Sequence, residues 1–171
     1  MLHPDLAIRK SPLSGKGLFA KKTIPKGTIV WKLEGEPARI YTENQYKKFA
    51  KRYKKILNKY AYKDNYGKII YLLCNSKFWN HSCDPNATPI NNKLDMDIAI
   101  KDIKPTQEIT YDYAFLLLDS QKIQKCKCKS KNCRVLIKRE PQNSRIINRL
   151  SKLAREASRQ LNKVKQPLLK P

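Results

Sequence analysis

The spacing of apolar side chains predicts two amphipathic helices. Across Thr42–Tyr60, apolar residues recur every three or four positions with lysines between them, which predicts one helix with a basic outer face. Across Ser144–Val164, apolar residues recur about every 3.5 positions, which predicts a second helix. Pro141 and Pro167 set the limits of this second helix, because proline cannot continue helical hydrogen bonding.

The rest of the chain favours short strands and tight turns. Residues Ala7–Ile40 contain two glycine-marked turns, SGKG and PKG, between β-favouring runs such as TIVWKL. Lys68–Leu73 and Asp97–Ile100 predict further strands, and the proline-marked stretch IKPTQEITYDY predicts a last one. The expected fold is therefore mainly β with helices. It forms one domain over residues 7–116, with a helical region inserted at 42–62.

A large excess of positive charge narrows the choice of partners. The chain of 171 residues has 37 Lys and Arg against 14 Asp and Glu, a formal net charge of +23. Such an excess attracts nucleic acid, nucleosomes, anionic membranes or acidic proteins, and the alternative is a solvated surface with no such partner. Basic residues dominate the C-terminal extension at 141–171. This extension is expected to pack on the domain, to bind a polyanion or to form a dimer.

Apolar runs and cysteines indicate the compartment. No apolar run approaches the roughly 20 residues of a membrane-spanning helix, and Met1–Lys10 lacks the apolar core of a signal peptide. The sequence therefore predicts an intracellular protein without a membrane partner. Five cysteines, an odd number, fit metal binding better than a disulfide framework.

Three of the five cysteines lie close together in CKCKSKNC, as Cys126, Cys128 and Cys133. A disulfide within a C-x-C pair is strained, whereas a structural zinc ion binds cysteine sulfurs tetrahedrally at about 2.3 Å. The cluster therefore predicts a closed structural zinc site, with free or redox-active thiols as the alternative. A fourth ligand must come from elsewhere. The candidates are Cys83, Cys74, His81 and His3.

Three other motifs are ambiguous when each is taken alone. SKFWNHSCDPNATP contains a histidine in a turn-forming run, and such a histidine is most often structural. EITYDY directs Tyr111 and Tyr113 to one face of a strand, where aromatic rings usually serve the core. SGKGLFA lets the backbone approach a ligand, but it lacks the third glycine of a dinucleotide-binding loop.

Taken together and in order, the motifs SGKGLFA, FWNHSCDPN, EITYDYAF and CKCKSKNCR resemble the SET domain with its zinc-binding post-SET segment. The resemblance spans about Lys10–Arg134, with the post-SET segment at 122–138, and the extension beyond Pro141 lies outside it. It implies a β-clip-like fold of short sheets around a knot-like active site. It also implies a protein lysine methyltransferase that takes its methyl group from S-adenosylmethionine.

The resemblance assigns the ligand-binding residues. In this family the G-x-G-L turn contacts the methyl donor through its backbone, and the Asn and His of the NHS motif close over it. Zinc-bearing members use the cysteine of NHSC as the fourth ligand, which nominates Cys83 and leaves Cys74 unpaired. The resulting zinc set is Cys83, Cys126, Cys128 and Cys133. The resulting donor set is Ser14, Lys16, Gly17, Leu18, Tyr60, Asn80, His81 and Lys127.

The resemblance also assigns the residues of the reaction. Tyr113 occupies the position of the catalytic hydroxyl, and Tyr111 occupies the position that influences how many methyl groups are added. A tyrosine at the position of Tyr111 favours mono- or dimethylation in this family. One departure is Leu33, because many members carry a tyrosine there.

Two function classes follow from these observations. The first is a methyltransferase that acts on histone tails or nucleosomes in a nucleus, or in a host nucleus if the source is a microbe. The cationic surface would then hold DNA phosphates. The alternative, favoured by Leu33 and by the charge, is a catalytically weak or inactive SET scaffold that binds chromatin or nucleic acid.

Overall fold

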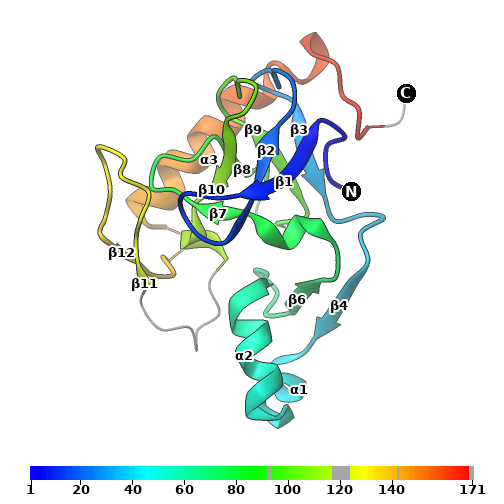
Figure 1. Ribbon diagram of the computed structural model, residues 1–171, viewed down its shortest axis with the longest axis vertical. Coiled ribbons are helices and arrows are strands. Elements are labelled where there is room, and N and C mark those ends of the chain that lie inside the picture. Colours follow the sequence, from blue (N-terminus) through cyan, green and yellow to red (C-terminus); the bar gives the residue numbers. More distant parts are fainter. Residues whose placement is uncertain (92–93, 117–123, 142, 170–171) are drawn as a thin grey trace.

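A computed structural model describes residues 1–91, 94–116, 124–141 and 143–169 (Figure 1). The largest sheet in this part of the chain has the strand order β1-β2-β10-β7, in which β7 and β10 pair in parallel. Its strands are β1 (Leu6–Lys10), β2 (Lys16–Ala20), β10 (Glu108–Tyr111) and β7 (Asn80–His81).

Three smaller sheets complete the β structure of the described residues. One has the order β3-β9-β8, from β3 (Ile29–Lys32), β9 (Met96–Ala99) and β8 (Ala87–Pro89). Another has the order β4-β6-β5, from β4 (Ala38–Tyr41), β6 (Ile69–Leu72) and β5 (Ala61–Lys63). A two-stranded ribbon pairs β11 (Gln124–Lys125) with β12 (Leu136–Ile137). Short sheets joined by irregular connections agree with the expected mainly β class.

The helix predicted over residues 42–60 is two helices, so the prediction of one continuous helix is wrong. These helices are α1 (Glu43–Lys48) and α2 (Lys51–Tyr60), separated where Phe49 adopts an extended backbone. The break lets the Phe49 ring pack edge-on between Tyr41 and Tyr53, at centroid distances of 4.9 and 5.0 Å. The apolar periodicity continues through the break because α1 and α2 contribute to one hydrophobic cluster with β5 and β6.

The C-terminal helix is shorter than the predicted Ser144–Val164. The Ser144 side chain accepts a hydrogen bond from the Ile147 N–H at the start of α3 (Arg145–Ser158), and a short 3-10 turn follows at Leu161–Lys163. Beyond the helix the chain returns to the start of β3, where the Gln166 amide accepts from the Ile29 N–H and donates to the Gly27 carbonyl, each at 2.9 Å.

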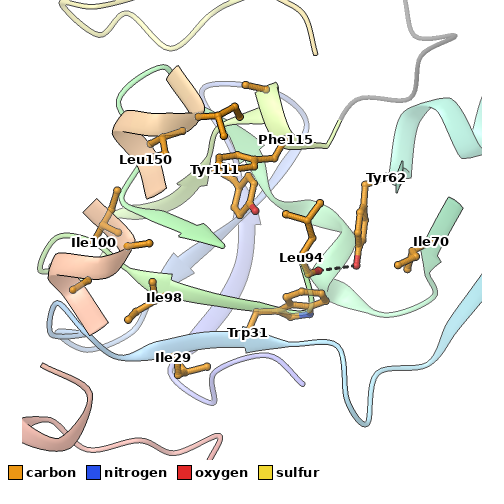
Figure 2. Close-up of a cluster of buried hydrophobic side chains, with 14 of the residues drawn as sticks. Ile29, Trp31, Tyr62, Ile70, Leu94, Ile98, Ile100, Tyr111, Phe115 and Leu150 are labelled. Atoms are coloured by element: carbon orange, nitrogen blue, oxygen red, sulfur yellow. Dashed lines mark hydrogen bonds between the residues drawn. The ribbon is translucent and has the colours of Figure 1, made fainter. Parts of the chain in front are cut away.

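The apolar face of α3 is covered by the domain itself. Ile147, Leu150, Ala154 and Ala157 are buried, and the helix contacts β8 and β9 (Figures 1 and 2). Of the three expectations for the extension, packing on the domain is confirmed. A dimer through this helix stays a prediction, and it would have to use the polar face.

The main hydrophobic core lies between α3, the β3-β9-β8 sheet and the end of β10 (Figure 2). Two 3-10 turns complete the secondary structure near the core, one at Asn75–Phe78 and one at Tyr113–Phe115.

Within the described ranges, no helix is both long enough and apolar enough to cross a bilayer. Residues 122–123 of the expected zinc segment, and residues 142, 170 and 171 of the extension, lie outside the described residues.

Candidate active site and metal centre

Two distant segments cross at the centre of the site. The parallel pairing of β7 with β10 sets Asn80 beside Thr110 and His81 beside Tyr111. The Asn86 side chain ties the same crossing together, because its Oδ1 accepts from the Thr110 N–H at 2.8 Å and its Nδ2 donates to the Glu108 carbonyl at 2.9 Å. The NHS and EITYDY motifs therefore meet at this crossing.

A cavity of about 430 Å³ opens at this crossing. Most of the residues predicted to bind the donor or to take part in the reaction line this cavity. They are Ser14, Lys16, Tyr60, Asn80, His81, Tyr111, Tyr113 and Lys127. Gly17 and Leu18 do not line the cavity, and the side chain of Leu18 is fully buried in the second hydrophobic cluster.

The Asn80 amide fixes the glycine turn. Its Nδ2 donates to the carbonyls of Ser14 and Lys16 at 3.2 and 3.0 Å, and to Glu108 Oε1 at 2.7 Å. A Cβ at Gly17 would lie 2.0 Å from the same Glu108 oxygen, so a larger residue there would push Glu108 away from the Asn80 amide. Glu108 was missed by the sequence reasoning, because a charged residue at a strand end normally faces water. Its hydrogen bonds make it part of the frame of the cavity.

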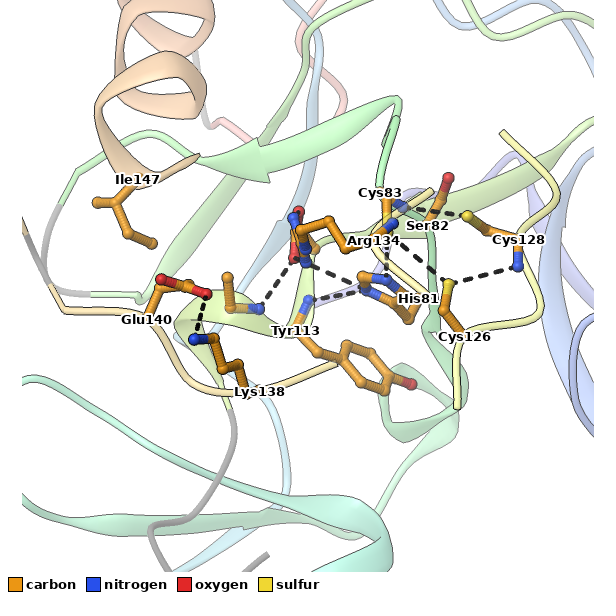
Figure 3. A network of polar contacts seen from close by, with 12 residues as sticks. His81, Ser82, Cys83, Tyr113, Cys126, Cys128, Arg134, Lys138, Glu140 and Ile147 are labelled. Carbon is orange, nitrogen blue, oxygen red and sulfur yellow. Dashed lines mark hydrogen bonds and ion pairs between the residues drawn. The ribbon is translucent and has the colours of Figure 1, made fainter. Parts of the chain in front are cut away.

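His81 connects the cavity to the cysteine cluster. Its Nδ1 accepts from the Tyr113 N–H at 3.1 Å, and its Nε2 lies 3.2 Å from Cys83 Sγ (Figure 3). Burial lowers the pKa of His81 to about 4, so the ring is neutral near pH 7. With Nδ1 accepting, the single ring proton is on Nε2 and points at the cysteine sulfur.

The two tyrosines have different surroundings. The Tyr113 hydroxyl donates to the Trp79 carbonyl at 2.6 Å, and burial raises the pKa of this phenol, so it stays protonated. Burial also raises the pKa of Tyr111, and the nearby negative charge of Asp97 raises it further. Asp97 was missed as a site residue, although an acidic residue inside a predicted apolar strand was a signal that could have identified it.

Four cysteines converge beside His81. The sulfurs of Cys83, Cys126, Cys128 and Cys133 all lie within 4.8 Å of one another, and Cys83 Sγ is 3.7 Å from Cys126 Sγ. Tetrahedral ligands at 2.3 Å from a zinc ion would be about 3.8 Å apart, so the spacing fits zinc.

Backbone donors support the same interpretation. Each of the four sulfurs accepts a backbone N–H at 3.4–3.5 Å, as expected for thiolates that hold a cation. Of the other candidate ligands, His81 lies beside the cluster, with its Nε2 3.2 Å from Cys83 Sγ, and Cys74 and His3 lie elsewhere. The Cys74 thiol forms hydrogen bonds with Glu36 and Ser76, and the His3 Nδ1 accepts a hydrogen bond from the Asp5 N–H.

An ion pair between Arg134 and Asp112 joins the cysteine segment to the residue that follows β10. The Arg134 guanidinium donates two hydrogen bonds of 2.7 Å to the Asp112 carboxylate, which is fully buried (Figure 3). A buried carboxylate that loses its bidentate partner is left without compensation for its desolvation. This ion pair therefore fixes Asp112, the residue between the two site tyrosines, to the segment that carries the cysteines.

We expect Arg134→Leu to lower the free energy of unfolding by about 3 kcal/mol, in line with breaking a buried ion pair. Chemical denaturation monitored by circular dichroism measures this loss. Lys131→Leu is the matched control, because Lys131 is exposed in the same segment. Equal losses in the two variants would show that the bidentate pair contributes nothing specific.

The rim of the cavity is cationic. Lys16 and Lys77 lie over the Phe78 ring, each at 5.5 Å, and Lys59 lies over Tyr60 at 5.0 Å. Such contacts hold ammonium groups near aromatic faces while leaving their charge in water. The rim therefore favours ligands that carry negative groups.

Known proteins resemble this chain in sequence. The family model described as SET domain matches residues 15–114. Histone-lysine N-methyltransferase Set2 of Drosophila melanogaster is 30% identical over 143 residues, which cover 74% of this chain. The variant-silencing SET domain-containing protein of Plasmodium falciparum is 30% identical over 145 residues, or 75% of this chain. The chain spans only 6% and 5% of the length of these two relatives.

Two solved structures share the fold. The methyltransferase domain of the human histone-lysine N-methyltransferase SETMAR aligns with a TM-score of 0.61 and 20% identity, over 81% of this chain and 60% of that one. The crystal structure of KRYPTONITE in complex with mCHG DNA and SAH aligns with a TM-score of 0.57 and 23% identity, over 79% of this chain and 29% of that one. The mainly β class expected from the sequence is confirmed.

Proposed function

The chain belongs to the SET-domain family, and from that premise we propose that it is a protein-lysine N-methyltransferase that uses S-adenosylmethionine as its methyl donor. The observation that carries the proposal is the single cavity shared by the glycine turn, the NHS motif and the tyrosine pair. Named relatives such as Set2 of Drosophila are histone-lysine methyltransferases, and SAH is bound in the KRYPTONITE structure.

The proposed reaction is an in-line attack of a lysine amine on the sulfonium methyl group. It requires a neutral amine, although the pKa of a free lysine is about 10.4. Aromatic walls from Trp31, Tyr62 and Tyr111 exclude water, which lowers the pKa of an ammonium group and favours release of its proton to solvent. Tyr113, fixed on the Trp79 carbonyl, leaves its oxygen lone pairs free to face the methyl group in transit.

The donor-binding roles follow from position in the cavity wall. Ser14, Lys16 and Asn80 line the cavity and are joined by hydrogen bonds from the Asn80 amide, and His81, Tyr60 and Lys127 line the same cavity. Backbone contacts from Gly17 and Leu18 complete the proposed set. The cationic rim suits the carboxylate of the donor.

Zinc is proposed as a structural ion at the four-cysteine cluster, bound by Cys83, Cys126, Cys128 and Cys133. When bound, the ion supplies cross-links and no chemistry at the reacting carbon, because all four coordination positions are filled by sulfur. The segment that it would hold contributes Lys125, Lys127 and Ile137 to the cavity wall.

Transfer of a radiolabelled methyl group from S-adenosylmethionine to nucleosomes tests the activity. We expect labelled histone with the wild-type chain. The second candidate function is an inactive SET scaffold that binds chromatin or nucleic acid. It is favoured by Leu33, which packs on the core at a position where many members of the family carry a tyrosine. Donor binding by calorimetry without any transfer to nucleosomes, histones or a lysine-peptide library would support that second function.

A histone tail on a nucleosome is the proposed substrate, which places the protein at chromatin in a nucleus or in a host nucleus. The exposed basic side chains of α1 and α2 form a cationic surface that nucleosomal DNA would complement. They are Lys47, Lys48, Lys51, Arg52, Lys55 and Lys59.

Binding to nucleosomes is expected to weaken steeply with salt, because each neutralised phosphate releases counterions. Between 50 and 200 mM salt, the affinity should fall by at least about tenfold in a gel-shift titration. Lys51→Glu with Lys55→Glu should flatten this dependence, whereas the control pair Lys22→Glu with Lys104→Glu, outside α2, should not. Binding that ignores salt would contradict phosphate contacts through this surface.

A further inference from the structure

The wall of the cavity contains one acidic side chain. Among the described residues that line the cavity, Asp97 on β9 is the single carboxylate. The side chains of opposite charge in this lining are Lys16, Lys59, Lys77, Lys125 and Lys127. Lysines suit a ligand with negative groups, whereas a substrate lysine arrives as a cation. Asp97 is therefore the charged group of the wall that complements the substrate amine.

Asp97 is buried without a cationic partner. It is 5% exposed, and in the described part of the chain no Lys, Arg or His forms an ion pair with it. Buried carboxylates are normally paired, because an isolated charge loses its hydration. Burial, with a further contribution from the charge of Asp95, raises the pKa of Asp97 to about 8. A cation that entered the cavity would supply the missing partner.

Aromatic rings surround the same carboxyl group. Trp31 on β3 pairs with Asp97 on β9, so the two side chains lie next to each other on one face of that sheet. Tyr62 and Tyr111 line the same cavity, and Figure 2 shows both rings near Trp31. Burial, followed by the charge of Asp97, raises the pKa of both phenols, so they stay neutral. A carboxylate among aromatic faces is suited to an alkylammonium group.

We propose that Asp97 is a catalytic base, whose carboxylate binds the ammonium group of the substrate lysine and accepts one proton from it before methyl transfer. This inference rests on the proposed function. The proton moves from nitrogen to a carboxylate oxygen, which leaves a neutral amine and a neutral carboxylic acid. The amine lone pair then forms the N–CH3 bond while the S–CH3 bond breaks and its electron pair stays on sulfur. Asp97 later gives its proton to solvent.

The pKa of Asp97 suits this role. A general base is most effective when its pKa lies near the working pH, and a value of about 8 meets that condition. The approaching ammonium group favours the ionised carboxylate, because opposite charges stabilise each other. The titratable groups around Asp97 are Asp95 and the two neutral phenols of Tyr62 and Tyr111. Only ionised Asp97 can accept a proton, so activity should fall as the pH drops below about 8.

The pH dependence of kcat/KM for a lysine substrate tests the proposal in Asp97→Asn. This variant keeps the shape of the side chain and should be about 10²-fold slower near pH 8.5, the usual contribution of a general base. Between about pH 8.5 and about pH 9.5, the wild-type value should change less than about twofold, because Asp97 is already ionised. The variant depends on amine that is already neutral in solution, so its value should rise about tenfold. A tenfold rise in the wild type would overturn the proposal, because the proton would then leave directly to solvent.

Two further measurements separate a base from a structural or donor-binding residue. The pKa of Asp97 is raised on folding, so its ionisation costs stability as the pH rises from about 4 to about 8. Asp97→Asn should therefore melt no lower than the wild type near pH 9, and a lower melting temperature would overturn the proposal. Donor affinity by calorimetry should stay within about twofold of wild type. A larger loss would place the carboxylate on the donor and would also overturn it.

Asp102→Asn is the matched control, because Asp102 is exposed and does not line the cavity. It should keep the wild-type rate and pH profile, and a profile like that of Asp97→Asn would overturn the assignment to Asp97. Failure of the proposed function is distinguishable. A wild-type chain that methylates no substrate at any pH would remove that function and this inference with it, whereas an altered profile alone would overturn only the role of Asp97.

Discussion

Tyr113→Phe is expected to lower the rate of methyl transfer by about 10²–10³-fold, the usual cost of one oriented polar group in an active site. The hydroxyl is held by the Trp79 carbonyl and the backbone N–H of the same residue is held by His81, so both ends of Tyr113 are fixed. Fixed groups act without reorganisation when the reaction occurs, and this makes them effective. The phenylalanine ring keeps the packing against His81 and loses only the oxygen.

Single-turnover labelling from S-adenosylmethionine measures the rate, and calorimetry measures donor affinity. We expect a much lower rate of methyl transfer and a donor affinity within about threefold of wild type, because the oxygen acts mainly in the transition state. Tyr66→Phe is the matched control, since Tyr66 is 69% exposed. A Tyr113→Phe protein with a wild-type rate would contradict the catalytic role.

Cys128→Ser is expected to reduce zinc content and, with it, donor affinity by about tenfold or more, equivalent to at least about 1.4 kcal/mol. The physical reason is that the β11–β12 segment is short, so four sulfur ligands would fix much of its position. This segment brings Lys125, Lys127 and Ile137 to the cavity wall. Without the metal cross-links, this segment would lose conformational entropy when it orders around the donor, and that cost would weaken donor binding.

Zinc is measured by plasma mass spectrometry after dialysis, stability by thermal melting and donor affinity by calorimetry. Cys74→Ser is the matched control, because the Cys74 thiol lies outside the cluster and forms hydrogen bonds with Glu36 and Ser76. The control should keep its zinc. Purified wild-type protein without stoichiometric zinc, or Cys128→Ser with unchanged donor affinity, would refute the proposed role of the metal.

Much of this protein could be inferred from local patterns. The order of the glycine turn, NHS motif, tyrosine pair and cysteine cluster is a property of the chain, and it led to the family that the comparisons show. Amphipathic spacing found the helical regions because one face of each must be apolar to pack on a sheet. Ser144 began α3 as expected, since its hydroxyl satisfies a free N–H of the first turn.

Other features depended on contacts between residues far apart in the sequence. Spacing could not show that helix 42–60 breaks at Phe49, because the break depends on Tyr41 and Tyr53 receiving its ring. Residue type also left four candidates for the fourth metal ligand. The parallel pairing of β7 with β10 placed Cys83 at the cluster and left Cys74 with Glu36.

The chemistry of the cavity likewise depends partly on the sequence alone and partly on the tertiary structure. The sequence alone determined which reactive groups exist, namely two tyrosines, an Asn-His pair and four thiols, because side-chain chemistry is local. Only the tertiary structure decided that Asp97 and Tyr111, from different strands, line the same cavity. Burial, hydrogen-bond partners and pKa are set by every segment that packs around a group, and such packing is not readable from its neighbours in the chain.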